Sequence, residues 1–144
     1  MTNAPAFHLA FPIKDIEETR SFYAGVLDCQ VGRECDTWID FDFFGHQISA
    51  HVSTQADQAI GTNAVDGDAV PVRHFGVILE WDDWQALADR ITRAGIPFII
   101  EPHVRFRGEA GEQATMFFMD PSRNALEFKS FRDMSRVFAR SDSR

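Results

Sequence analysis

The stretch FHLAFPIKDIEETRSFYAGVLDC, residues 7–29, decides the fold of this chain. Its first seven residues alternate between two faces: Phe7, Leu9 and Phe11 lie on one, and His8 and Ala10 on the other, as in a strand with one buried face. A helix then opens at residue 15 in a capping-box pattern, and apolar residues recur at helical spacing up to residue 26. The stretch therefore predicts a strand followed by a helix that packs on the sheet.

A second stretch, RHFGVILEWDDWQALADRITRAG at residues 73–95, repeats this order, with a strand expected at residues 72–81 before the helix. Asp82 and Gln85 repeat the cap, and Gly95 follows Asp82 by the same interval as Asp28 follows Asp15. Three strands should follow each helix, at residues 29–35, 37–43 and 46–53, and at 98–104, 115–120 and 125–131. We therefore expect an α+β fold of two βαβββ modules in a cup-shaped mixed sheet.

The module boundaries follow from composition within a chain that we expect to be one domain, residues 1–144. Module 1 should span about residues 6–53 and module 2 about 71–131, joined by a linker at 54–70 and followed by a tail at 132–144. The linker is rich in Ala, Asp and Gly. A loop at residues 103–113, with two glycines and four charges, should be mobile and could cover a site.

Composition excludes several classes of protein. The net charge of −8 argues against nucleic-acid binding, and no apolar run is long enough to span a membrane. The N-terminus lacks the basic segment of a signal peptide, and the two cysteines form no CxxC motif, which favours reduced thiols. We expect a cytoplasmic protein with a small-molecule substrate and with neither nucleic acid nor membrane as a partner.

Four candidate metal ligands occupy the outer strands of the two modules. His8 and His51 lie on the first and last strands of module 1, and His74 and Glu127 on those of module 2. Imidazole and carboxylate groups suit a divalent metal such as Fe(II), Mn(II), Ni(II) or Zn(II). Each candidate has a small residue two positions away on its own strand face, which leaves room for a metal and a substrate.

Weaker candidates lie nearby. His46 should point away from the His51 face, and His103 opens the long loop, where it is either an acid/base group or a surface histidine. Arg105 and Arg107 could bind a substrate carboxylate or phenolate, or could simply be solvated. A lone histidine in a core is more often a hydrogen-bonded structural residue, but four candidates in symmetric positions favour the metal site.

The two quoted stretches, together with MFFMDPSRNALEFKSF near the end, resemble the vicinal oxygen chelate superfamily over about residues 6–131. The segments WIDFDFFGHQISAH, VDGDAVPVRHFGV and RFRGEAGEQATMFF are similar to its small predicted extradiol-type dioxygenases. The resemblance implies metal ligands on the first and last strands of each module, which correspond to His8, His51, His74 and Glu127. Asp28 and Arg123 replace glycines that are usual in the superfamily, but both lie in turns.

Two enzyme chemistries and one binding role are compatible with this set. An extradiol-type dioxygenase would hold Fe(II) with His8, His74 and Glu127, leaving His51 as an acid/base group. A glyoxalase-type isomerase would use His51 as a fourth ligand to a Lewis-acid metal. A metal-free binding protein is the third class, but such proteins typically lack these ligands. The subgroup resemblance favours the dioxygenase with Fe(II), and Mn(II), Ni(II) and Zn(II) are alternatives.

A homodimer is expected from the aromatic stretch at residues 38–44 and from the open edge strands of a two-module sheet. Related small members of the superfamily are commonly twofold dimers. In such a dimer the loop of one subunit could lie near the metal of the other.

Overall fold

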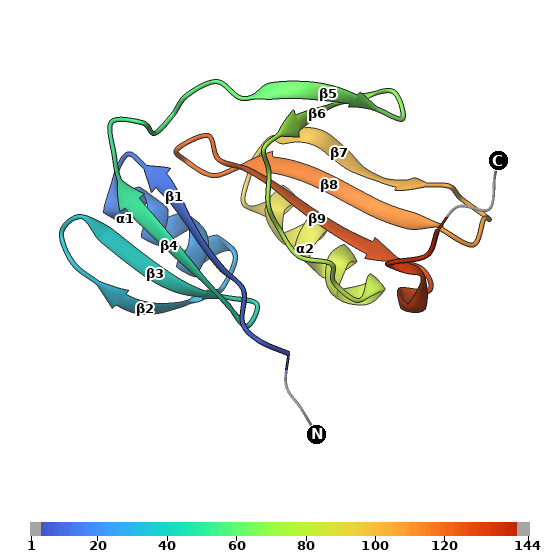
Figure 1. Ribbon diagram of the computed structural model, residues 1–144, viewed down its shortest axis with the longest axis horizontal. Helices are drawn as coiled ribbons and strands as arrows, with labels where there is room; N and C mark the ends of the chain where they lie inside the picture. The colour runs from blue at the N-terminus through green and yellow to red at the C-terminus, as the bar shows by residue number, and fades with distance from the viewer. Residues whose placement is uncertain (1–3, 141–144) are drawn as a thin grey trace. The chain divides into compact units, whose positions relative to one another are not determined.

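The computed structural model describes residues 4–140 of the chain and divides it into two compact units. Unit 1 runs to Gly61 and includes Met119–Asn124 from the second half of the sequence. Unit 2 comprises Thr62–Phe118 and the chain from Ala125 onward. Each unit is built around its own sheet (Figure 1). Within residues 4–140, no helix is both long and apolar enough to cross a membrane.

Unit 1 contains a four-stranded sheet with the order β1-β4-β3-β2. Strand β1 (His8–Ile13) runs parallel to β4 (His46–Val52), and β3 (Trp38–Phe43) is antiparallel to both β4 and β2 (Gln30–Glu34). Helix α1 (Ile16–Arg20) continues into a π-helical segment, η1 (Ser21–Val26). The core of the unit includes the fully buried side chains Ile13, Tyr23, Ile39, Phe41 and Ile48.

The predicted helix cap of unit 1 is confirmed. Asp15 is the N-cap residue, and its Oδ2 accepts a hydrogen bond of 2.9 Å from the backbone nitrogen of Glu18. Asp28 ends the helical region with a φ of 61°, the left-handed conformation that its position required. The strand boundaries expected for residues 29–53 agree with β2, β3 and β4 to within one or two residues.

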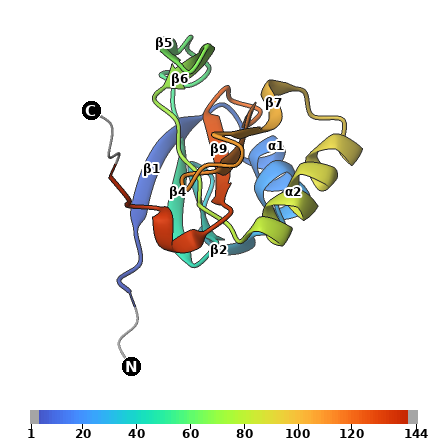
Figure 2. The same ribbon diagram turned by 90° about the vertical axis from the view of Figure 1, so that its right-hand side faces the viewer.

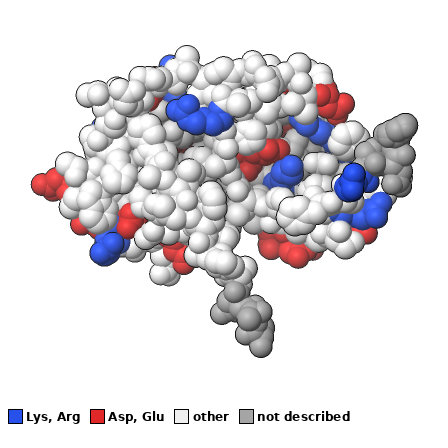
Figure 3. Space-filling model, in the orientation of Figure 1, with Lys and Arg blue, Asp and Glu red and all other residues white. Residues whose placement is uncertain are grey.

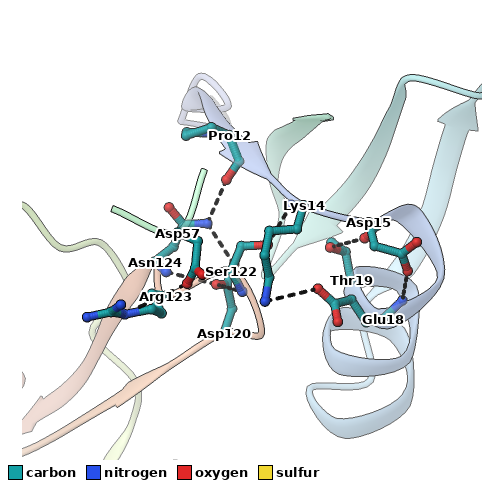
Figure 4. A network of polar contacts seen from close by, with 10 residues as sticks. All are labelled: Pro12, Lys14, Asp15, Glu18, Thr19, Asp57, Asp120, Ser122, Arg123 and Asn124. Carbon is teal, nitrogen blue, oxygen red and sulfur yellow. Dashed lines mark hydrogen bonds and ion pairs between the residues drawn. The ribbon is translucent and has the colours of Figure 1, made fainter. Parts of the chain in front are cut away.

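A turn from late in the sequence completes unit 1 (Figure 4). Asp120 Oδ2 accepts hydrogen bonds from the hydroxyl of the buried Tyr23 and from Nδ2 of Asn124, each of 2.9 Å. Asn124 Nδ2 also donates to the backbone oxygen of Pro12, and the backbone nitrogen of Lys14 donates to Ser122 Oγ. Burial raises the pKa of the Asp120 carboxyl, although these donors oppose the effect.

Unit 2 contains a three-stranded sheet in the order β7-β8-β9, formed by β7 (Phe98–Arg105), β8 (Gln113–Met119) and β9 (Ala125–Phe131), in which β7 and β8 are antiparallel. Helix α2 (Trp81–Arg93) packs along β9 on one face of this sheet (Figure 2). Trp84 Nε1 donates a 2.8 Å hydrogen bond to the backbone oxygen of Phe128. Gly95 follows the helix with the expected positive φ.

Three expectations for the second half need correction. The predicted linker contains a hairpin, β5 (Gly61–Val65) and β6 (Asp68–Val72). The predicted strand at residues 72–81 makes only two isolated parallel bridges to β9, Phe75 to Leu126 and Ile78 to Lys129. Helix α2 begins at Trp81 and takes Glu80 as its N-cap, so Asp82 lies in the first turn instead of capping it.

Smaller features complete the description. The tail contains one short 3-10 turn, η2 (Met134–Arg136). Both cysteines are free, and burial raises the pKa of Cys29 to about 12, whereas Cys35 is exposed. On the face drawn in Figure 3, basic and acidic side chains are interspersed.

Candidate metal centre

His74 and Glu127 form a polar pair in unit 2. Nε2 of His74 lies 3.1 Å from Oε1 of Glu127, and the side chains of His74 and Glu127 are 28% and 14% exposed. His74 Nδ1 donates a 2.6 Å hydrogen bond to the backbone oxygen of Pro71, because a carbonyl can only accept. The ring is therefore fixed with Nε2 directed at the carboxylate, which is the arrangement of a metal-binding histidine.

The other carboxylate oxygen of Glu127 is also held. Oε2 accepts a short hydrogen bond of 2.5 Å from Oγ1 of Thr115, a residue of β8 that is 1% exposed. The ring of Phe117, two residues further along β8, meets the His74 ring in a T-shaped contact with centroids 5.0 Å apart. Both candidate ligands are thus oriented by neighbours on the same sheet face before any metal binds.

The contact between His74 and Glu127 also shifts the pKa of each residue. The hydrogen bond with Glu127 raises the pKa of His74, although partial burial opposes this. Burial alone would raise the pKa of Glu127, but its hydrogen bonds with His74 and Thr115 outweigh burial and lower it. The carboxylate is therefore ionised at neutral pH and available to a cation.

Gly76 explains how the two residues come together. A Cβ atom at this position would lie 1.6 Å from the backbone oxygen of Glu127, far inside any real contact. The segment after His74 can therefore run against β9 only with glycine here, held by hydrogen bonds between the backbones of Phe75 and Glu127 and of Phe75 and Ala125. The sequence HFGV contained this signal, since glycine is needed where two backbones approach closely.

In unit 1, His8 has an equivalent arrangement. Its Nδ1 lies 2.8 Å from Oε1 of Gln47 on the neighbouring strand β4. An amide oxygen accepts, so His8 Nδ1 carries the proton and Nε2 is left with its lone pair. Gln47 Nε2 lies 3.5 Å from Oδ2 of the buried Asp40, whose Oδ1 accepts a 2.6 Å hydrogen bond from Ser49.

The register of β1 and β4 separates His8 from His51. His8 pairs with Gln47, and His51 pairs with Pro12 four residues further along. Both histidines share a sheet face, but they stand about 13 Å apart along the strands. The structure therefore does not bring His51 to His8, and the side chain beside His8 is the neutral amide of Gln47. Sequence reasoning missed Gln47 and Asp40. Alternation along a strand indicates which face a side chain occupies, but not which residue of the neighbouring strand lies opposite it.

The remaining histidine candidates have partners of their own. His46 Nδ1 accepts a 2.9 Å hydrogen bond from the backbone nitrogen of Phe7. His103 pairs with Thr115 across β7 and β8, so it lies on the sheet face of Glu127, about 10 Å away. His103 Nδ1 donates to the backbone oxygen of Glu101, and its Nε2 lies 3.4 Å from Arg105 Nε.

The two arginines of the long loop differ. Arg105 Nη2 forms a 2.8 Å ion pair with Asp68 of the β5–β6 hairpin, and its side chain is 10% exposed. Arg105 is therefore a structural anchor between the hairpin and β7. Arg107 is exposed and lies in the turn after β7.

These residues fit a divalent metal by the chemistry of their donors. Both imidazoles have Nδ1 engaged, Nε2 of His74 faces the Glu127 carboxylate, and that carboxylate has a fixed orientation. Within residues 4–140, no three His, Cys, Asp or Glu side chains gather closely enough to hold a metal ion. The structure pairs His74 with Glu127 in unit 2 and places His8 and His51 in unit 1, so the four-residue set is a prediction.

An open cavity of about 330 Å³ lies in unit 1 beside Gln47. Its lining combines acidic, basic and neutral polar groups with backbone and small residues: Ala6, Gly32, Arg33, Asp40, Phe41, Asp42, Gly45, His46 and Gln47. The cavity is large enough for a small oxygenated molecule.

Comparisons with known proteins place the chain in a family. The model of the Glyoxalase/Bleomycin resistance protein/Dioxygenase superfamily matches residues 6–128. A structure titled glyoxalase/bleomycin resistance protein/dioxygenase from Alicyclobacillus acidocaldarius is 34% identical, with 96% of this chain and 100% of that chain covered and a TM-score of 0.80. A search of curated proteins found no match.

More distant structures share the fold alone. A genomically encoded fosfomycin resistance protein from Listeria monocytogenes is 15% identical over 90% of this chain and 94% of that chain, with a TM-score of 0.66. A lactoylglutathione lyase from Agrobacterium tumefaciens is 13% identical over 90% and 96%, with a TM-score of 0.60. The expected α+β, glyoxalase-like fold is confirmed.

Proposed function

The chain belongs to the Glyoxalase/Bleomycin resistance protein/Dioxygenase superfamily, and from this premise we propose that it is an extradiol-type dioxygenase acting on a small, catechol-like substrate. Its metal would be Fe(II), held by His8, His74 and Glu127. Superfamily members include dioxygenases by the family's own description, so the chemistry lies within its range.

One observation carries the proposal: the residue beside His8 on β4 is Gln47, not a histidine or a carboxylate. Two histidines and one carboxylate leave three of six coordination positions open, which is what a bidentate substrate and O2 need together. A four-ligand isomerase site would require another strong donor at this place. The neutral amide is already engaged with His8, which favours the three-ligand set.

The protein groups have distinct roles in this proposal. When bound, Fe(II) would bind the substrate oxygens and O2 and would allow electron transfer from the substrate to O2. In the metal-free protein Glu127 is ionised because His74 Nε2 and Thr115 donate to it; a bound metal would replace the His74 proton, and the carboxylate would balance part of its charge. His103 lies on the same sheet face with Nδ1 held by a carbonyl; its Nε2 accepts a long hydrogen bond of 3.4 Å from Arg105 Nε, and once that bond is released Nε2 can accept the proton that a catechol loses on binding.

Metal reconstitution tests the proposal. The metal-free protein is loaded under argon with Fe(II), Ni(II) or Zn(II), and O2 uptake with a panel of catechols is compared with isomerisation of a 2-oxoaldehyde hemithioacetal. We expect O2 uptake and ring-cleaved product with Fe(II) alone. Isomerisation by the nickel or zinc form, without O2 uptake by the iron form, would show that the isomerase assignment is the right one.

Two variants serve as a matched pair. Glu127→Ala removes a proposed ligand, whereas His51→Ala removes a histidine that the register keeps away from His8. The first should lose iron binding and O2 uptake, and the second should retain iron. Iron retained by Glu127→Ala at one equivalent would contradict the ligand set.

A further inference from the structure

We propose that Asp40 is a positioning residue: acting through Gln47, it determines which ring nitrogen of His8 is free to bind a metal. The inference rests on the proposed function, because it treats His8 as a ligand. It assigns roles to Asp40 and Gln47, neither of which is a proposed metal ligand.

Asp40 is a carboxylate in an environment that requires hydrogen-bond donors. It is 6% exposed and lies on β3 directly opposite Ser49 of β4. Ser49 Oγ donates to its Oδ1 at 2.6 Å, and Gln47 Nε2 donates to its Oδ2 at 3.5 Å. A buried carboxylate can accept hydrogen bonds but cannot donate them, so it demands the NH2 end of the Gln47 amide.

The need of Asp40 for a donor also fixes the position of the Gln47 amide oxygen. With its nitrogen toward Asp40, Gln47 presents Oε1 to His8, at 2.8 Å from Nδ1. An oxygen at this place selects the Nδ1–H form of the imidazole and leaves the Nε2 lone pair free. If the amide rotated by half a turn, its NH2 group would face His8 and select the opposite form, in which Nε2 carries the proton and cannot bind a metal.

Nδ1 of His74 is also protonated, but a different kind of acceptor holds it. Its Nδ1 donates to the backbone oxygen of Pro71, an acceptor that cannot rotate. The two candidate ligand histidines therefore have the same protonated nitrogen, one fixed by backbone and one by a side chain. Because only the side-chain acceptor can turn round, His8 needs a further residue to hold Gln47, and Asp40 is placed to do this.

A role for Asp40 as an acid/base group fits less well. Both of its oxygens are engaged by Ser49 and Gln47, and the residue is nearly inaccessible although it borders the unit 1 cavity. A group that exchanges protons with a substrate needs an oxygen within reach of that substrate. The geometry thus favours action through Gln47.

The test measures the ring tautomer of His8 by nitrogen NMR on the metal-free protein, about two pH units above the usual imidazole pKa of ~6.5. In the unaltered protein we expect His8 as the Nδ1–H form. In Asp40→Ala, Gln47 loses its anchor, and the Nδ1–H share of His8 should fall to about half or less. His74 should be unchanged, which makes it an internal control.

Two further variants keep the result interpretable. Gln47→Met changes an exposed residue, so folding should be retained, and it should also shift His8 toward the Nε2–H form. Ser49→Ala removes the other hydrogen bond of Asp40 but leaves the contact with Gln47, so His8 should stay as Nδ1–H. If His8 is Nε2–H in the unaltered protein, or if Asp40→Ala and Gln47→Met leave it unchanged, the proposal is wrong.

Zinc titration separates this proposal from the proposed function. If both hold, Asp40→Ala and Gln47→Met should weaken Zn(II) binding by about 10- to 100-fold, the usual effect of losing a residue that orients a ligand. His8→Ala should weaken it at least as much. A tautomer shift in Asp40→Ala without any loss of zinc affinity in His8→Ala would refute the ligand role of His8 and leave the action of Asp40 on Gln47 intact.

Discussion

Replacing Gly76 with alanine should separate His74 from Glu127 without touching either side chain. The added Cβ would lie 1.6 Å from the backbone oxygen of Glu127, whereas real contacts of this kind are essentially never under 3.0 Å. The segment must therefore move away from β9 by more than an ångström. Two backbone hydrogen bonds, of 2.9 Å and 3.2 Å from Phe75, span this contact and would be stretched or lost.

The loss of stability in Gly76→Ala follows from these contacts. Two lost hydrogen bonds contribute about 1 kcal/mol each, and overpacking adds about 1–3 kcal/mol, so the free energy of unfolding should fall by about 3–5 kcal/mol. For a chain of this size that corresponds to a drop in Tm of roughly 6–20 °C. Zinc affinity should fall as well, because the Nε2–Oε1 separation of 3.1 Å cannot be kept.

The matched control is Gly25→Ala. Nothing lies within 4 Å of a Cβ at Gly25, which belongs to the π-helical segment η1. This variant should be neutral or slightly stabilising, since alanine is favoured over glycine in a helix. Thermal unfolding of both variants decides the matter: a Gly76→Ala protein with unchanged Tm and unchanged zinc affinity would refute the close-approach argument.

Three further predictions concern charge, metal and assembly. In the metal-free protein, the pKa of His74 is raised, so its contribution to stability is complete at pH values below the ordinary histidine pKa of 6.5. The pKa of Glu127 is lowered, so its contribution is complete at pH values above the ordinary glutamate pKa of 4.5. The stability lost in His74→Gln, measured by urea unfolding, should therefore be largest between these values and shrink as the pH rises through the raised pKa of His74; a loss independent of pH would contradict the ion pair. Chelator treatment of the iron-loaded protein should abolish O2 uptake, and adding Fe(II) but not Zn(II) should restore it. We expect a homodimer in sedimentation at micromolar concentration, and a species of 16.3 kDa would exclude it.

The dimer prediction now has less support from the sequence than before. It drew on the aromatic stretch at residues 38–44, but Phe41 and Phe43 are buried in the core of unit 1. Phe44 is 41% exposed and is the one phenylalanine of the stretch left at the surface of the described chain. A single exposed phenylalanine is ordinary, so the expectation now depends on edge strands and on resemblance.

Local chemistry predicted the elements of the fold well. The Asp15 cap, the left-handed residues Asp28 and Gly95, and the three strands after each helix follow from short-range rules, and the structure has them; the expected opening strand of module 2 is the exception. The β5–β6 hairpin was missed because its composition was read as a linker. Its turn, Asp66–Gly67 with positive φ at both residues, is a known hairpin signal that was present in the sequence.

The candidate site was harder to predict because it depends on pairing between distant strands. Alternation correctly indicated that His51 and Ser49 share a face, but it could not indicate that Gln47 is the residue opposite His8. Register is set by the packing of β1 against β4 across 39 residues of sequence, and no local pattern encodes it. The role suggested for Asp40 follows only once that register is known.

The turn at Met119–Asn124 has a consequence for biosynthesis. It belongs to unit 1, yet Asn124 and Asp120 lie 112 and 97 residues after their partners Pro12 and Tyr23. While the first half emerges from the ribosome, the hydroxyl of Tyr23 has no Asp120 to accept its hydrogen bond, and Pro12 has no Asn124. Unit 1 can therefore reach its final state only after translation has passed residue 124, and the N-terminal module cut out alone would lack a piece of its own interior.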